Sequence, residues 1–208
     1  MAKNILTARI HLKGSRPLLW HRFGAEALSG DRKERTGTAG NDSEEWRHTV
    51  LVTPEGQLYL EPTYAFATLR EAARYTKKGR SSLQANLAAT LQVLDEQIPV
   101  NRWWPGFPGG QLFSLKEATP PAEDPTQPIY LDIRGVVNPS TRARNVRYRI
   151  AAAPGWECQV TVRWDVSVVS REQLQAIAQD AGQLVGIGNG RAIGFGRFEV
   201  TQCEFQAD

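Results

Sequence analysis

The stretch that decides the fold is residues 170–205, SREQLQAIAQDAGQLVGIGNGRAIGFGRFEVTQCEF. Ser170 followed by Gln173 is the pattern of a capping box at the start of a helix. Leu174, Ile177 and Ala178 then recur at the spacing of one helix face. This apolar face continues through Ala181, Leu184 and Val185. A glycine-rich segment and an apolar alternation follow, so the stretch predicts a helix, a loop and a closing strand.

The loop between this helix and strand is rich in both glycine and arginine. It contains Gly186, Gly188, Gly190, Gly194 and Gly196, with Arg191 and Arg197 among them. A dinucleotide-binding fingerprint needs the order strand, glycines, helix, so that the pyrophosphate meets a helix N-terminus. Here the order is helix, glycines, strand, and no GKS or GKT follows. The sequence therefore argues against both a dinucleotide site and a P-loop.

Two interpretations of the loop stay open. In the architectural one, Gly186 ends the helix as its C′ residue and the other glycines serve a tight connection or a bulge. In the ligand-binding one, glycines let the main chain approach a bulky ligand, and arginine supplies a charge-assisted contact to phosphate. The presence of Arg191 between the glycines favours contact with an anion or a nucleic acid.

Outward from this stretch, alternating segments predict further strands, at 4–12, 129–137, 145–150 and 156–168. Helical periodicity is found at 63–78 and 81–98. The order reduces to β-α-β-β-α-β, which predicts an α+β fold with a ferredoxin-like (RRM-like) core and an antiparallel sheet. We expect one domain over 1–208, with a long inserted loop after the first strand at 29–45 and an inserted helical and proline-rich segment at 62–127.

The spacing G-x-G-x-x-x-x-x-G-x-G resembles the signature of the RAMP superfamily, the RNA-binding proteins of CRISPR effector complexes. Gly186, Gly188, Gly194 and Gly196 fit it, and Arg191 is the basic residue inside it. The chain looks most like the backbone subunits, which polymerise along guide RNA and use an inserted loop as a thumb. The resemblance covers mainly residues 128–205, and such segments also resemble uncharacterised phage proteins.

Charge is unevenly distributed along the chain. The formal net charge is only +3, but five arginines and no acid lie between Arg134 and Arg149. Arg142, Arg144, Arg147 and Arg149 are expected to follow phosphates or to form a solvated strand face. Together with the seven loop residues, these four arginines are the predicted nucleic-acid-binding site.

Other features bound the class of protein. The longest apolar runs are shorter than a membrane span, and the N-terminus has no signal-peptide pattern. A cytoplasmic protein without membrane contact is expected. Cys158 and Cys203 lie in strand patterns and are expected to be buried thiols. No spacing of cysteine or histidine indicates zinc, and we expect no metal and no cofactor.

The leading hypothesis is a non-catalytic protein that binds RNA or single-stranded DNA, with other subunits or further copies of itself along the strand. A second hypothesis is a metal-independent endoribonuclease. It follows from the resemblance, because related RAMP endoribonucleases use a histidine, here His21, as general acid or base. A third is a phage protein that uses the same fold for protein contacts alone.

Overall fold

The computed structural model describes residues 4–22, 42–107, 112–137, 142 and 144–206. The chain divides into two compact units. The first unit comprises Met1–Leu18, Tyr59–Asn101 and Pro154–Asp208, and the second comprises Leu19–Leu58 and Arg102–Ala153. Most of the long loop expected at 29–45 lies outside the described residues.

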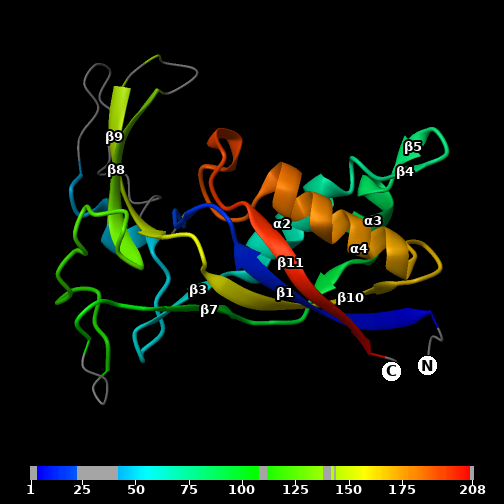
Figure 1. Cartoon of the computed structure of the whole chain (residues 1–208), viewed down its shortest axis with the longest axis horizontal. Helices are drawn as coiled ribbons and strands as arrows, with labels where there is room; N and C mark the ends of the chain where they lie inside the picture. Colours follow the sequence, from blue (N-terminus) through cyan, green and yellow to red (C-terminus); the bar gives the residue numbers. More distant parts are fainter. Residues whose placement is uncertain (1–3, 23–41, 108–111, 138–141, 143, 207–208) are drawn as a thin grey trace, which may run out of the picture. The chain divides into compact units, whose positions relative to one another are not determined.

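The first unit is built on an antiparallel sheet with the strand order β11-β1-β10-β7-β3 (Figure 1). The strands of this sheet are β1 (Ile5–Gly14), β3 (Gln57–Leu60), β7 (Ile98–Trp103), β10 (Glu157–Asp165) and β11 (Phe198–Gln206), and the short β6 (Gln92–Val93) also pairs with β10. The first two residues of β3 and the last two of β7 are assigned to the second unit. Strand β1 lies between β11 and β10 and is antiparallel to both. The first and last long strands of the chain are therefore neighbours.

Helices α2 (Pro62–Ala72), α3 (Gln84–Thr90) and α4 (Arg171–Asp180) lie on one side of this sheet (Figure 1). Helix α4 begins with the predicted capping box. The Gln173 N–H donates to Ser170 Oγ at 3.3 Å, and the Ser170 N–H donates to Gln173 Oε1 at 2.9 Å. Its last turn, Ala181–Val185, widens into a π-helical turn. This turn leaves Leu184 46% exposed instead of buried.

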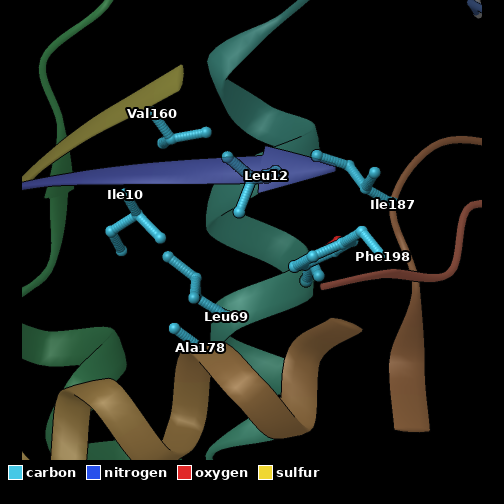
Figure 2. Close-up of a pocket in the computed structure, with 9 residues that line it drawn as sticks. Ile10, Leu12, Leu69, Val160, Ala178, Ile187 and Phe198 are labelled. Carbon is cyan, nitrogen blue, oxygen red and sulfur yellow. The ribbon is translucent and has the colours of Figure 1, made fainter. Parts of the chain in front are cut away.

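The core of the first unit lies between the sheet and the helices. Figure 2 shows side chains from β1 and β10 reaching towards Leu69 of α2 and Ala178 of α4, with Ile187 and Phe198 closing one side. These residues enclose a small cavity of about 20 Å³. Its lining is apolar, and a polar lining is what holds a water molecule in place. The two ends of the glycine loop thus contribute directly to the core.

The second unit contains a sheet with the order β2-β9-β8, formed by β2 (Leu18–Leu19), β8 (Ile129–Val137) and β9 (Arg144–Ala152). A short helix, α1 (Glu45–Thr49), packs against β9. Trp46 of α1 is fully buried and stacks on Trp104, with ring centroids 5.4 Å apart. Phe113 extends this aromatic cluster at 5.2 Å from Trp104.

Three predicted elements differ from the structure. The helix expected at 63–78 ends at Ala72 because residues 74–82 offer no apolar face to bury; the hairpin of β4 (Lys77–Lys78) and β5 (Ser81–Ser82) replaces it. The helix expected at 81–98 ends at Thr90 because Gln92 and Val93 pair with β10. The sequence of residues 46–62 predicts two short strands around the Pro-Glu-Gly turn at 54–56, but the start of this segment is instead α1, in which Glu45 and Trp46 are both buried.

The expectation of an α+β protein with antiparallel sheets is confirmed. The single domain over 1–208, with its inserted segment at 62–127, stays a prediction. Among the described residues, no helix combines the length and the apolar character needed to cross a membrane.

Candidate functional site

The glycine loop runs from the π-helical turn of the first unit to β11. Five of its glycines have positive φ angles, from +66° at Gly196 to +91° at Gly194. Gly190 and Gly194 flank a single 3-10 turn, Arg191–Ile193. Because L-residues rarely adopt this conformation, glycine is required by the main-chain path itself.

The two ends of the loop are sealed by packing. A Cβ atom at Gly196 would lie 1.7 Å from the Ile187 carbonyl oxygen. The Ile187 N–H donates to the Gly196 carbonyl at 2.9 Å, and the Gly196 N–H donates to the Pro17 carbonyl at 2.7 Å. Thr68 of α2 donates to the Gly186 carbonyl at 3.0 Å. At Gly186 and Gly196 the architectural interpretation is therefore sufficient.

The tip of the loop is different. A Cβ atom at Gly194 would meet nothing within 4 Å, so only its φ angle requires glycine. Ile193 is 63% exposed and Ala192 is also exposed. Gly190 is half-buried, whereas Gly188 is buried. The main chain is therefore accessible to a ligand at Gly190–Gly194 and inaccessible at Gly186, Gly188 and Gly196.

The two loop arginines have different surroundings. Arg191 forms an ion pair with Glu71 of α2, with 3.3 Å between Nη1 and Oε2. Arg197 is half-buried, and no carboxylate of the described residues lies within ion-pair distance of it. Its Nη1 atom is shielded from solvent and has no hydrogen-bond acceptor among the described residues. A shielded guanidinium donor without an acceptor is costly unless a ligand supplies one.

Arg16 is a basic residue near the loop that sequence reasoning missed. It is exposed, and its N–H donates to the Arg197 carbonyl at 3.2 Å. The Arg16 carbonyl accepts the Trp156 indole N–H at 2.8 Å, which fixes its main chain. The bend GSRP at 14–17 was the available signal, but only the fold brings it beside Arg197.

The four predicted arginines of 142–149 lie on the second unit and are not equivalent. Arg142, with a φ angle of +58°, and Arg144 are exposed. Arg147 forms an ion pair with Glu45 of α1, with 2.7 Å between Nη1 and Oε1. Two of the four are thus accessible, and a third is engaged by a carboxylate.

Arg149 is only 5% exposed, which corrects the expectation that it contacts phosphates. Its Nη2 lies 3.3 Å from Asp132 Oδ2, and Arg134 donates to the same carboxylate at 2.8 Å. The cross-strand register places Asp132 directly opposite Arg149. Arg147, two residues earlier on the same strand, is partly exposed, so burial is specific to the Arg149 end of the strand.

His21 belongs to the same cluster in the second unit. Its Nδ1 lies 4.0 Å from Glu45 Oε1, and its side chain is 30% exposed. Burial lowers the pKa of His21 below its ordinary value of 6.5; Glu45 opposes the shift, and Arg147 and Arg149 add to it. Neutral imidazole is therefore favoured at neutral pH.

The face of the main sheet turned away from the helices is polar. It carries Arg9, His11 and Lys13 from β1, Glu157, Gln159, Thr161 and Arg163 from β10, and Gln202 and Glu204 from β11. Charges of both signs alternate, with Lys13 and Glu157 3.7 Å apart. No Phe, Tyr or Trp from these three strands lies on this face, but β7, which pairs with β10, ends in Trp103, whose side chain is 56% exposed.

The described part of the chain includes both cysteine thiols and individual side chains of the kinds that bind metals. It contains no group of three or more His, Cys, Asp or Glu side chains that could hold a metal ion. Burial raises the pKa of the Cys158 thiol to about 12. Cys203 is half-buried, and burial raises its pKa as well. For both thiols this shift disfavours the thiolate, which is the nucleophilic form.

Comparison with known proteins gives a likeness of fold. No family model and no curated protein matches the sequence. A chain of the Type III-B Cmr-beta bound to cognate target RNA matches 98% of this chain with a TM-score of 0.51 and 9% identity. This chain spans 61% of the length of that one. A chain of a Type IV-B CRISPR complex matches with a TM-score of 0.43 and 13% identity, covering 97% of this chain and 90% of the other.

Proposed function

We propose that this protein binds the sugar–phosphate backbone of RNA or single-stranded DNA at the tip of its glycine loop. The observations that carry the proposal are the shielded Nη1 of Arg197, which has no acceptor among the described residues, and the exposed, glycine-flanked turn Arg191–Ile193 earlier in the same loop. Arginine is suited to phosphate because its planar guanidinium can donate two parallel hydrogen bonds. Arg16 and Arg191 add positive charge on the same unit.

The main sheet is, in this proposal, a ferredoxin-like core of the RAMP type. Taking β1, α2, β7, β10, α4 and β11 in chain order gives β-α-β-β-α-β with the spatial order of strands 4-1-3-2. This is the split βαβ arrangement. The likeness of fold to a chain of a complex bound to target RNA supports the assignment.

We infer that the protein works as a subunit of a ribonucleoprotein assembly and has no catalytic role in it. Binding of the phosphate backbone carries no sequence information, so pairing between nucleic-acid strands would supply specificity. The polar sheet face, with charges of both signs, is suited to contact with another subunit or a further copy of this chain. Arg142 and Arg144, which are exposed on the second unit, keep their predicted role in phosphate binding.

The test is a titration of a short labelled RNA with the purified protein and its Arg197→Gln variant. The variant removes one charge-assisted hydrogen bond to phosphate, so affinity should fall by about tenfold. The matched control is Arg9→Gln, which removes an exposed arginine from the polar sheet face. Equal effects of the two variants, or no binding at all, would overturn the proposed site. In the latter case, a protein partner purified with the native chain would favour the protein-contact hypothesis.

A second candidate function is metal-independent RNA cleavage by His21. The observation that favours it is the position of His21 beside Glu45 and Arg147, with its pKa lowered towards a neutral base. A neutral imidazole can accept a proton from a ribose hydroxyl, and an arginine can stabilise the charge that develops on phosphate. Cleavage of RNA in EDTA that is lost in His21→Ala and retained in His48→Ala would support this function.

A further inference from the structure

The end of α2 and the hairpin after it form the most basic part of the first unit, and neither the glycine loop nor the core accounts for these charges. From Pro62 to Leu94 there are five basic residues and one acidic residue, Glu71. The basic ones are Arg70, Arg74, Lys77, Lys78 and Arg80. All five are exposed. Four of them fall within seven residues, in the sequence RYTKKGR.

This segment has a defined local structure. Helix α2 ends at Ala72, and the Tyr75 N–H donates to the Ala72 carbonyl at 2.9 Å. The hairpin of β4 and β5 then pairs Lys78 with Ser81 across a two-residue turn. Gly79, with a φ angle of +65°, occupies the first turn position, as type II′ turns require. Figure 1 shows the hairpin projecting beyond the helices of the first unit.

Nothing in the described part of the chain neutralises this hairpin. No carboxylate there lies within ion-pair distance of Arg70, Lys77, Lys78 or Arg80. Like charges held this close repel one another and disfavour a fixed hairpin. The hairpin also buries no large apolar side chain that would offset the repulsion. A polyanionic partner would relieve it.

Glu71 joins this basic segment to the glycine loop. Its Oε2 lies 3.3 Å from Arg191 Nη1, and its Oε1 lies 3.9 Å from Arg74 Nη1. One carboxylate therefore connects an arginine of the loop with an arginine of the basic segment. All three side chains are partly exposed, and such surface pairs are weak and readily exchanged for another anion.

Tyr75 adds an aromatic surface to the same place. Its side chain is 44% exposed, and the Arg74 guanidinium lies 5.2 Å from its ring centroid. Aromatic rings and guanidinium planes are the groups on which unpaired bases stack in proteins that bind single strands. Bases inside a duplex are already stacked on each other, so an exposed ring on a basic surface favours a single strand.

We propose that Arg70–Ser82 is a second contact surface for single-stranded nucleic acid, continuous with the glycine loop through Glu71 and Arg191. Phosphates lie along the basic side chains, and one base stacks on Tyr75. This inference rests on the proposed function, since the same strand leaves the loop and follows the hairpin. It adds a second binding surface and a preference for single-stranded over double-stranded nucleic acid, neither of which the loop alone defines.

The test uses the full chain and compares Arg80→Glu with the matched reversal Arg9→Glu on the polar sheet face. Arg80→Glu should weaken binding of a labelled single-stranded RNA on the order of tenfold. Arg9→Glu should change it much less. Tyr75→Ala should weaken the same binding on the order of tenfold and leave binding of a duplex of equal length unchanged. Tyr75→Phe keeps the ring and should bind as the native protein does.

The outcomes separate this inference from the function on which it rests. If binding depends on Arg197 but not on Arg80 or Tyr75, the loop site stands and the second surface is wrong. If Arg80→Glu and Arg9→Glu weaken binding equally, the effect is one of net charge and the surface is again wrong. If the protein binds anionic lipid vesicles through Arg80 and does not bind RNA, both the proposed function and the second contact surface are wrong.

Discussion

The glycines of the 186–197 loop are required for different physical reasons, although the sequence does not distinguish them. Gly196 has no room for a side chain, whereas Gly194 has room but an unfavourable φ angle for any other residue. The spacing of the glycines could be read from the sequence. The sequence does not show which glycine faces the Ile187 carbonyl, because the two ends of the loop come into contact only in the folded chain.

Gly196→Ala should destabilise the first unit more than Gly194→Ala. Both substitutions place a Cβ at a positive φ angle, which costs about 1–2 kcal/mol. Only the first also forces a Cβ to within 1.7 Å of a backbone oxygen, so its total cost should be at least about 2 kcal/mol higher. Urea unfolding of the two variants measures the difference, and equal midpoints would show that the loop ends are not packed as described.

The pKa of His21 should make stability depend on pH. The unfolded chain titrates at the ordinary value of 6.5, whereas burial lowers the pKa in the folded protein. The unfolded state therefore holds more protons between the two pKa values, and stability falls as the pH drops below about 6.5. His21→Gln should reduce this loss in urea unfolding on either side of that pH. An NMR titration of His21 at or above 6.5 would contradict the argument.

Arg149 illustrates what residue patterns alone do not reveal. The alternation of residues 145–150 predicts that Asn145, Arg147 and Arg149 share one face, and the pairing of β9 with β8 agrees. The sequence does not say that Asp132 of the neighbouring strand lies opposite Arg149, or that α1 brings Glu45 to Arg147. Asp132 is 17 residues from Arg149 and Glu45 is 102 residues from Arg147, so strand pairing and helix packing were needed to separate the accessible arginines from the engaged ones.

At the scale of elements, the signals that depend on neighbouring residues were reliable. The capping box at Ser170 starts α4 as predicted. The helical periodicity of 81–98, which comes from four leucines and Ile98, was a weaker guide. Leu83, Leu87 and Leu91 are buried, but Leu94 is 39% exposed and Ile98 belongs to a strand. Burial was thus predicted better than helical structure, because pairing with β10 offered the backbone another way to satisfy its hydrogen bonds.

Ser170→Ala should destabilise the protein by about 1 kcal/mol, because the Gln173 N–H loses its side-chain acceptor. The reciprocal bond from the Ser170 N–H to Gln173 Oε1 does not need the serine side chain and is retained. Ser81→Ala, at an exposed position in β5, is the control and should stay within about 0.5 kcal/mol of the native protein. Thermal unfolding measures both; a neutral Ser170→Ala would mean that the cap does not stabilise α4.

At the scale of the whole molecule, the basic residues fall into sets on two different units. The loop and hairpin cations belong to the first unit, and the exposed Arg142 and Arg144 to the second. Net charge conceals this, because +3 for the chain is the small remainder of 25 basic and 22 acidic residues. The local excess of basic over acidic residues decides the affinity for a polyanion, because salt screens the interaction of each exposed charge beyond about 10 Å.

Binding of a single-stranded RNA should weaken steeply with salt, and Arg197→Gln should reduce the steepness. Each phosphate contact contributes about 0.7 to the slope of log affinity against log salt for single strands. The variant should therefore lose about 0.7 of that slope, while Arg9→Gln should keep it. Titrations at several salt concentrations measure this, and an unchanged slope in Arg197→Gln would remove Arg197 from the interface.

Sequence patterns were enough to predict the class of fold, the start of α4, the faces of the long strands and the presence of a basic glycine loop. These depend on residues that are close along the chain, where periodicity and capping act locally. The tertiary structure alone decided which glycines are sealed, which arginines meet carboxylates and where Arg16 and the β4–β5 hairpin lie. Those outcomes depend on contacts between distant segments, and hydrogen bonding and burial select such contacts only once the chain has folded.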